Sequence, residues 1–264
     1  MTLAQYARIW LASVRYSLVR AMMFRFDFLL WSAVEFAWMS VNLLLVQVLY
    51  QHTESIAGWN KYEMLLLMGT SLLIQRLLMG LFWSNLYEIG RNVRTGYFDF
   101  FLAQPGHPLF MVSTRKLDPD GLANSFVAAG VVAYSAWRLG LHPGFLEVLV
   151  YVLMVICGLV IHYSFFLLTA SATFWIIKTE GIEGGYFTMF EFSRLPREAF
   201  KGLVGYLLVY LLPAVVVSNV PARTLIHGFE PRYAIWLVAA SAAWFTLAVF
   251  AFNQGLKRYA SASS

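Results

Sequence analysis

The chain has 264 residues, 60% of them hydrophobic, 17% aromatic and 12% charged, with a mean hydropathy of +0.65. Because a soluble domain carries about 25% charged residues, this composition places the chain among membrane proteins. The net charge of +5 is not gathered into a basic run and does not predict nucleic-acid binding, and a single cysteine excludes a disulfide framework or a cysteine metal site within one chain.

Residues 1–25 predict an amphipathic helix that lies along the cytoplasmic membrane surface. The apolar side chains on one face are Leu3, Tyr6, Trp10 and Val14, and the polar side chains opposite are Gln5, Arg8 and Arg15. A helical extension of the first membrane span is the alternative. No cleavable signal peptide is expected, because four arginines interrupt these residues.

Six apolar runs are long enough to cross a bilayer, which takes about 20 residues. They cover residues 28–50, 62–86, 122–139, 145–177, 203–220 and 233–253. The fourth run would measure about 50 Å as one helix, so it should tilt or extend beyond the membrane. The predicted fold class is an all-α membrane protein that forms one domain over residues 1–264.

Lysines and arginines predict the orientation of these spans. With the N-terminus in the cytoplasm, 14 of these residues lie inside, four lie outside and one, Arg76, lies within a span. This bias follows the positive-inside rule and predicts that both termini are cytoplasmic. Two polar segments, residues 87–116 and 178–201, are then cytoplasmic loops.

No motif for chemistry on this chain is present in the sequence. It contains no G-x-x-x-x-G-K-[ST] loop for ATP, no G-x-G-x-x-G and no G-x-S-x-G. The five histidines show no H-x-x-x-H spacing, so a metal site has little support. We therefore predict a non-enzymatic chain without catalytic residues, metal or cofactor of its own.

Polar residues mark the first two spans. Glu35 and Arg76 lie at similar depths from the cytoplasmic side, where an ionisable group usually faces the protein interior or a water-filled path. Asn42 and Gln75 add polarity to the same two spans. These residues either bind the two helices together or line a translocation path.

The loop over residues 87–116 contains the stretch RNVRTGYFDFFLAQPGHPLF, which is too apolar for a solvated connection. Gly96 permits a sharp turn into a short helix, and Pro105 and Pro108 end it. Asp99 near the helix start is favoured by the helix dipole.

The aromatic side chains of this short helix predict a docking face. Helical spacing lets Tyr97, Phe100 and Phe101 face a partner groove, as in helix-in-groove recognition. Phe98 and Leu102 would then contact the chain's own spans. The alternative is an interfacial helix among the lipid headgroups.

Prolines interrupt the fifth apolar run. Pro213 and Pro221 predict a kinked or re-entrant segment over residues 213–228 that could close the external mouth of a path. Irregular backbone at that depth is tolerated only where it is buried in protein or lines a cavity.

Two stretches resemble one branch of the bacterial ABC-2 type exporter permeases. The first follows that branch's loop pattern, R-x-G-x-[LF]-D-x-x-L-x-x-P-x-x-P, through Arg94, Gly96, Phe98, Asp99, Leu102, Pro105 and Pro108. The second resembles its C-terminal run through Phe192, Arg194, Pro196, Pro213, Pro221 and Ala222. The likeness covers nearly the whole chain, although "AQ" before Pro105 and Gly106-His107 after it depart from the branch.

The resemblance implies a permease subunit of an ATP-binding cassette exporter in the bacterial cytoplasmic (inner) membrane. Such a subunit works as a dimer with two cytoplasmic ATPase subunits on separate chains, which bind ATP and Mg. The second permease is a copy of this chain or, as this branch favours, a related chain in a heterodimer. The loop over 87–116 would hold the coupling helix that docks onto the ATPase.

Three other functions are alternatives for such a chain. An ATP-independent secondary carrier should show inverted repeats, and none is found. An enzyme acting on lipids would need clustered histidine or acidic residues at one membrane face. A non-transporting scaffold of an envelope complex would be distinguished by ATP turnover that does not respond to a solute. The transported substrate is not predicted.

Overall fold

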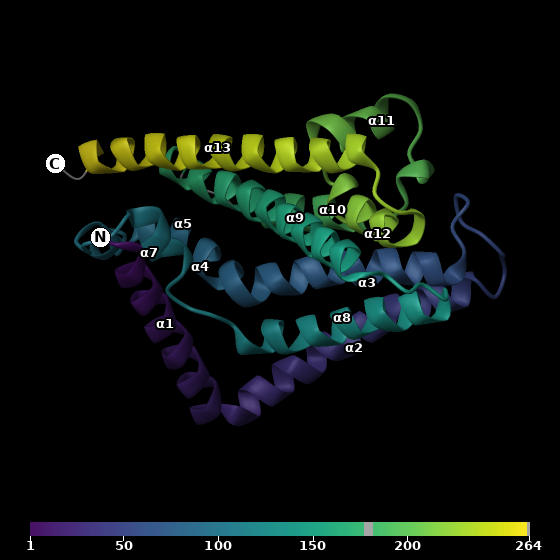
Figure 1. The fold of residues 1–264 in the computed structure, drawn as a ribbon. Helices are drawn as coiled ribbons and strands as arrows, with labels where there is room; N and C mark the ends of the chain where they lie inside the picture. Colours follow the sequence, from purple (N-terminus) through teal and green to yellow (C-terminus); the bar gives the residue numbers. More distant parts are fainter. Residues whose placement is uncertain (177–181, 263–264) are drawn as a thin grey trace.

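The computed structural model describes residues 1–176 and 182–262, which are helical apart from their connections and one isolated bridge between Ile56 and Trp59. Helix α1 (Leu3–Met23) begins with a capping box between Thr2 and Gln5. It ends at Phe24, and the chain turns there into α2, so that the two helices form a V (Figure 1). Helix α1 is therefore a separate helix and not an extension of the first span.

The remaining helices follow in chain order. The first half contains α2 (Arg25–Leu49), α3 (Lys61–Leu78), the π-helical turn η1 (Met79–Trp83), α4 (Ser84–Tyr87), α5 (Ile89–Arg94), α6 (Asp99–Leu102), α7 (Pro108–Ser113) and α8 (Pro119–Arg138). The second half contains α9 (Phe145–Ser171), η2 (Ala172–Phe174), α10 (Ile182–Ser193), η3 (Arg197–Ala199), α11 (Gly202–Tyr206), the π-helical turn η4 (Leu207–Leu211), α12 (Val216–His227) and α13 (Pro231–Ala262).

The bundle has two ends. The termini end holds both chain termini and the residues 87–116, and the far end holds the loops that follow α2, α8 and α12 (Figure 1). Helix α3 is the central element, and it packs against α2, α8, α9 and α12. It is buried along most of its length because these four helices surround it.

Four helices of the described residues are long and apolar enough to cross a membrane, and one sharply bent pair would add a fifth. The four are Arg25–Leu49, Lys61–Arg94, Phe145–Phe174 and Pro231–Tyr259. They overlap the expected runs 28–50, 62–86, 145–177 and 233–253, although Ile177 lies outside the described residues. Helix α8, over the expected run 122–139, is not among them, because polar residues such as Asn124 and Ser135 line its buried face.

The expected straight span over residues 203–220 is not formed. Its two halves, Gly202–Leu211 and Val216–His227, meet at 89°. Pro213 lies in the break, where a residue without a backbone N–H cannot continue the preceding helix.

Both ends of this bent pair lie at the far end of the bundle. Before it, the Arg197 backbone N–H donates to Asn219 at 2.9 Å and the Arg197 side chain approaches Glu230 at 3.8 Å. After it, Glu230 leads directly into α13. The pair therefore forms a bent hairpin, and its bend includes Pro213, where a break was expected.

Helix α10 lies where a cytoplasmic loop over residues 178–201 was expected. Tyr186 packs on Phe166 of α9, and the Ser193 hydroxyl bonds Ser71 of α3 at 2.6 Å. The chain then reaches Glu198, which bonds Trp59 of the far-end loop. Residues 194–201 consequently lie at the opposite end from residues 87–116, while residues 178–181 of the expected loop lie outside the described residues.

Helices α3 and α8 approach most closely at two glycines. The Asp118 backbone N–H donates to the Gly80 carbonyl at 2.9 Å, in the π-helical turn that widens α3. A Cβ on Gly121 would lie 2.7 Å from the Gly80 nitrogen and 2.9 Å from its Cα. Small residues allow such backbone contact between helices.

We predict that Gly121→Ala destabilises the protein, because its Cβ would meet backbone atoms that cannot rotate away. Overpacking of this kind costs about 1–3 kcal/mol and should lower the thermal unfolding temperature of the purified protein. Gly130→Ala is the matched control, because it lies on the same helix with no atom within 4 Å of its Cβ. Equal unfolding temperatures for the two variants would contradict the prediction.

Candidate functional site

Residues 87–116 form a folded platform at the termini end. The chain leaves α5 after Arg94, turns at Gly96 with a φ of +74°, makes the single turn α6, passes Pro105 and starts α7 with Pro108. The Phe98 N–H returns to the Asn92 carbonyl at 3.0 Å, which fixes the turn. The structure therefore has two short helices, α6 and α7, where one coupling helix was expected.

Two phenylalanines anchor this platform. Phe98 and Phe101 are 0% and 3% exposed, and Phe98 contacts the rings of Phe174 at the end of α9 and Phe252 of α13. Phe98 and the half-buried Leu102 thus face the chain's own helices as expected. Phe101 was expected to face outward, but its ring is buried. A one-turn helix followed by a bend turns this ring toward the buried residues that surround Phe98.

Two other aromatic rings of the platform are open to solvent. Tyr97 and Phe100 are 43% and 47% exposed and stack with ring centroids 5.5 Å apart. The Arg115 guanidinium lies 5.3 Å from the Phe100 ring and donates to the Tyr97 hydroxyl at 3.1 Å. Asp99 bonds the Tyr259 hydroxyl of α13, so it ties the platform to its own chain. The exposed pair is therefore held rigidly on an anchored base.

A basic notch of about 310 Å³ adjoins the exposed pair. Its walls include Arg91, Arg115 and Lys116, against one carboxylate, Glu88, which accepts from Lys116 at 2.7 Å. The notch and the rings together form an apolar and positively charged face.

The polar residues of the first two spans form two separate contacts. Glu35 and Arg76 form an ion pair, in which the Arg76 side chain is 2% exposed. Asn42 instead accepts from Arg194 at 2.7 Å, and so joins α2 to the end of α10. Gln75 is buried, and its carbonyl oxygen has no hydrogen-bond partner among the described residues.

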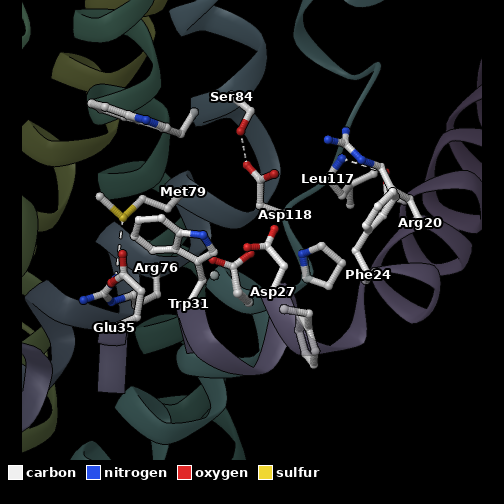
Figure 2. Close-up of a pocket in the computed structure, with 17 residues that line it drawn as sticks. Arg20, Phe24, Asp27, Trp31, Glu35, Arg76, Met79, Ser84, Leu117 and Asp118 are labelled. Carbon is white, nitrogen blue, oxygen red and sulfur yellow. Dashed lines mark hydrogen bonds and ion pairs between the residues drawn. The ribbon is translucent and has the colours of Figure 1, made fainter. Parts of the chain in front are cut away.

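A cavity of about 580 Å³ opens beside the Glu35–Arg76 pair. Its walls come from α1, α2, α3, η1 and the start of α8, and both charged and aromatic side chains point into it (Figure 2). Asp118 hydrogen-bonds Ser84 within it. Burial raises the pKa of Asp118 above 3.8 and the Asp120 carboxylate adds to this, against the Ser84 hydroxyl and the charges of Lys116 and Arg20.

Four charged residues join the bent hairpin of α11 and α12 to its neighbours at the far end. Arg223 of α12 donates to Glu198 at 2.6 Å and to Glu230 at 3.1 Å. Arg197 approaches the same two carboxylates at 2.9 Å and 3.8 Å. We call Arg197, Glu198, Arg223 and Glu230 the far-end ion network. Pro221 lies inside α12, and both Pro221 and Pro213 are buried.

Hydrogen bonds stabilise the charged form of Glu198. Burial alone would raise the pKa of this carboxyl, but hydrogen bonds from Arg197 and Trp59 and the charge of Arg223 outweigh burial. The pKa therefore lies below its ordinary value of 4.5.

Sequence reasoning missed the cavity and the far-end ion network. Asp118 and Asp120 follow a loop and resemble ordinary residues at a helix start, and Asp27 lies in the first turn of α2. Arg197 and Arg223 were expected on opposite sides of the membrane, so no contact between them was foreseen. An alternation of acidic and basic residues at positions 197, 198, 223 and 230 was the available signal.

Residues 36–263 match the family described as ABC-2 family transporter protein. The chain belongs to the ABC-2 family of transporter proteins. This confirms the resemblance drawn from residues 94–108 and 192–222. No curated relative and no solved structure matches the chain.

The ABC-2 family defines the chain in general terms. It is a multi-pass membrane permease of an ABC transporter, and permeases of this family are generally non-catalytic subunits that pair with an ATPase. The described residues hold no group of three or more His, Cys, Asp or Glu side chains that could bind a metal ion.

We predict that Glu198→Gln destabilises the permease at neutral pH and has less effect in acid. A lowered pKa in the folded state gives stability that is present above the unfolded pKa near 4.5 and is lost as the pH falls through the folded value. Unfolding temperatures of wild type and variant, measured from pH 7 downward, should converge below about pH 4.5. A difference that stays constant over this range would contradict the role of the charge.

Proposed function

We propose that the chain is the membrane subunit of an ATP-driven exporter in the bacterial inner membrane, with both termini in the cytoplasm. The observation that carries this proposal is the anchored platform, which presents two exposed aromatic rings on an ABC-2 permease that has no ATP-binding loop. A rigid apolar face at one end of a membrane bundle is suited to receive a push from a separate protein.

The proposed topology has six passages, made by α2, the helix from α3 to α5, α8, α9, α10 and α13. The hairpin of α11 and α12 does not cross and dips in from outside. Helix α8 has 20 residues, which at 1.5 Å each span about 30 Å. Helix α10 has only 12 described residues, fewer than the other proposed passages. This arrangement keeps the termini end cytoplasmic.

In the proposed mechanism, the platform receives the motion of the ATPase. Tyr97 and Phe100 dock into a groove of the ATPase, and the basic notch contacts acidic residues there. The push reaches α9 and α13 through Phe98, because its ring is packed between them. ATP and Mg bind to the ATPase chains, and a second permease completes the path as a copy of this chain or as a related chain in a heterodimer.

The external gate is proposed to be the re-entrant hairpin, with Pro213 at its bend and Pro221 within α12. The far-end ion network holds it against α10 and α13 in the closed state. Opening would separate Arg223 from Glu198 or Glu230, and the charges would then be hydrated by external water. The proposed path runs along the polar side chains of α2 and α3, from Glu35 and Arg76 outward.

We predict that Phe100→Ala or Tyr97→Ala weakens ATPase association about tenfold without lowering the unfolding temperature, because half-exposed aromatic anchors contribute mainly at an interface. The measurement is co-purification and stimulated ATP hydrolysis. Phe98→Ala is the contrasting variant, because loss of a buried ring costs about 3–5 kcal/mol of stability. Unchanged ATPase association in Phe100→Ala would overturn the docking role.

We predict that a membrane-impermeant thiol reagent labels Lys201→Cys from outside intact cells, in a Cys157→Ala background that carries no other thiol. Helix α10 as a passage puts residue 201 outside, whereas the alternative of a span over residues 203–220 puts it inside. Glu54→Cys in the far-end loop is the positive control, and Arg91→Cys is the cytoplasmic control. Protection of Lys201→Cys would overturn the proposed topology.

A further inference from the structure

The cavity between α1, α2, η1 and α8 has the size and shape of a small-molecule site. At about 580 Å³ it falls within the usual range of about 300–1,000 Å³ for ligand pockets. It is partly open, and its lining includes residues of both α1 and α2, the two helices that form the V (Figure 1). A single bound metal ion would leave most of this volume unfilled.

Carboxylates outnumber cations in the cavity wall. The wall contains four acidic residues, Asp27, Glu35, Asp118 and Asp120, and two arginines, Arg20 and Arg76. The Glu35–Arg76 ion pair leaves three carboxylates facing one arginine.

Two of the carboxylates lack partners. Asp118 accepts from Ser84, but neither Asp27 nor Asp120 makes a side-chain hydrogen bond or an ion pair with the described residues. Asp27 projects from the first turn of α2 and Asp120 from the first turn of α8, and both residues line the cavity. A cation bound in the cavity would be attracted by both carboxylates.

A buried donor also lacks a partner in this cavity. The Arg76 side chain is 2% exposed and lines the cavity, yet its Nε–H has no hydrogen-bond partner among the described residues. A buried donor without a partner carries a desolvation cost that a ligand oxygen would relieve. An oxygen atom of a ligand could therefore accept a hydrogen bond from Arg76, next to a bound cation.

Aromatic rings complete the walls. Trp31 and Trp83 line the cavity from α2 and η1, and Phe24 and Phe28 lie near its mouth. The face of an indole ring attracts organic cations, and quaternary ammonium groups are the usual ligands of such aromatic walls. Met23 and Phe26, which are neighbours in sequence of the lining residues Phe24 and Asp27, are exposed apolar side chains.

We propose that this cavity binds an amphiphile that carries an ammonium group, with the cation between Asp27 and Asp120 and the apolar part directed toward the mouth. The assignment of this ligand as transported cargo rests on the proposed function, whereas its binding does not. The ammonium group belongs either to a lipid headgroup or to a soluble amphipathic amine, and the chemistry of recognition is the same.

The test is calorimetric titration of the full chain, purified with its co-purifying subunits, in nanodiscs of phosphatidylglycerol. The probes are decyltrimethylammonium, decanoate and decanol, which share one alkyl chain, and empty nanodiscs supply the blank. We expect saturable binding of the ammonium probe alone. The isosteric double variant Asp27→Asn/Asp120→Asn should bind it at least about tenfold more weakly, because charge attraction is lost without a change of shape.

Two further variants separate binding from folding. Glu54→Gln removes an exposed carboxylate at the far end and should bind the ammonium probe like wild type. Trp31→Leu removes one aromatic wall from a side chain that is already 54% exposed, so it should fold normally and bind severalfold more weakly. Equal binding of decanoate, or binding that is unchanged in the double variant, would overturn the proposal.

A further titration with an added lipid identifies the source of the ammonium group. If phosphatidylethanolamine added to the nanodiscs weakens probe binding to wild type but not to the double variant, the natural ligand is a lipid headgroup. If it has no effect, the ligand is a soluble amine, and both outcomes support the site. Binding without a co-purifying ATPase would refute only the proposed function, and an ATPase complex that binds no probe would refute only this inference.

Discussion

The backbone contact between Gly80 and Gly121 is the constraint on which the termini end of the permease depends. It lets α8 start against the π-helical turn of α3, where Asp118 donates to the Gly80 carbonyl. A π-helical turn displaces the residues that follow it, and such turns often occur at functional sites. The same contact fixes one wall of the cavity and the point where the platform rejoins the bundle. Larger residues at either position would move both together.

The platform and the cavity share one connection. Residues 114–118 follow α7, and Leu117 and Asp118 among them line the cavity. The Leu117 N–H donates to Ser17 of α1 at 3.0 Å. The Tyr6 hydroxyl of α1 accepts a hydrogen bond from the His107 N–H at 2.9 Å. A push on the platform would therefore move α1 relative to α2, which are the two arms of the V beside the cavity. Coupling of this kind needs no motion of the central helix α3.

The sequence was informative where a segment's composition alone decides its structure. Apolar length located four long helices, and the Glu35 and Arg76 depths foretold their ion pair. The sequence was misleading where contacts with neighbouring helices decide the structure of a segment. Helix α10 has only 12 residues and follows a polar stretch, so it resembled a loop, whereas the hairpin at 202–227 is apolar enough to resemble a span. Phe101 looked like a docking residue because spacing cannot tell which side of a single helical turn is covered.

The far-end ion network and the cavity differ in how completely their charges are paired. In the far-end ion network each carboxylate meets two arginines, so the hairpin is held by pairs that would have to separate for it to open. In the cavity the carboxylates outnumber the arginines, so that end is left with attraction for a cation that the chain does not satisfy. Burial without full pairing is costly for charged groups, and proteins keep such groups mainly where a ligand completes them. Under the proposed topology, a fully paired network at one end and an incomplete site at the other would describe a permease that faces the cytoplasm.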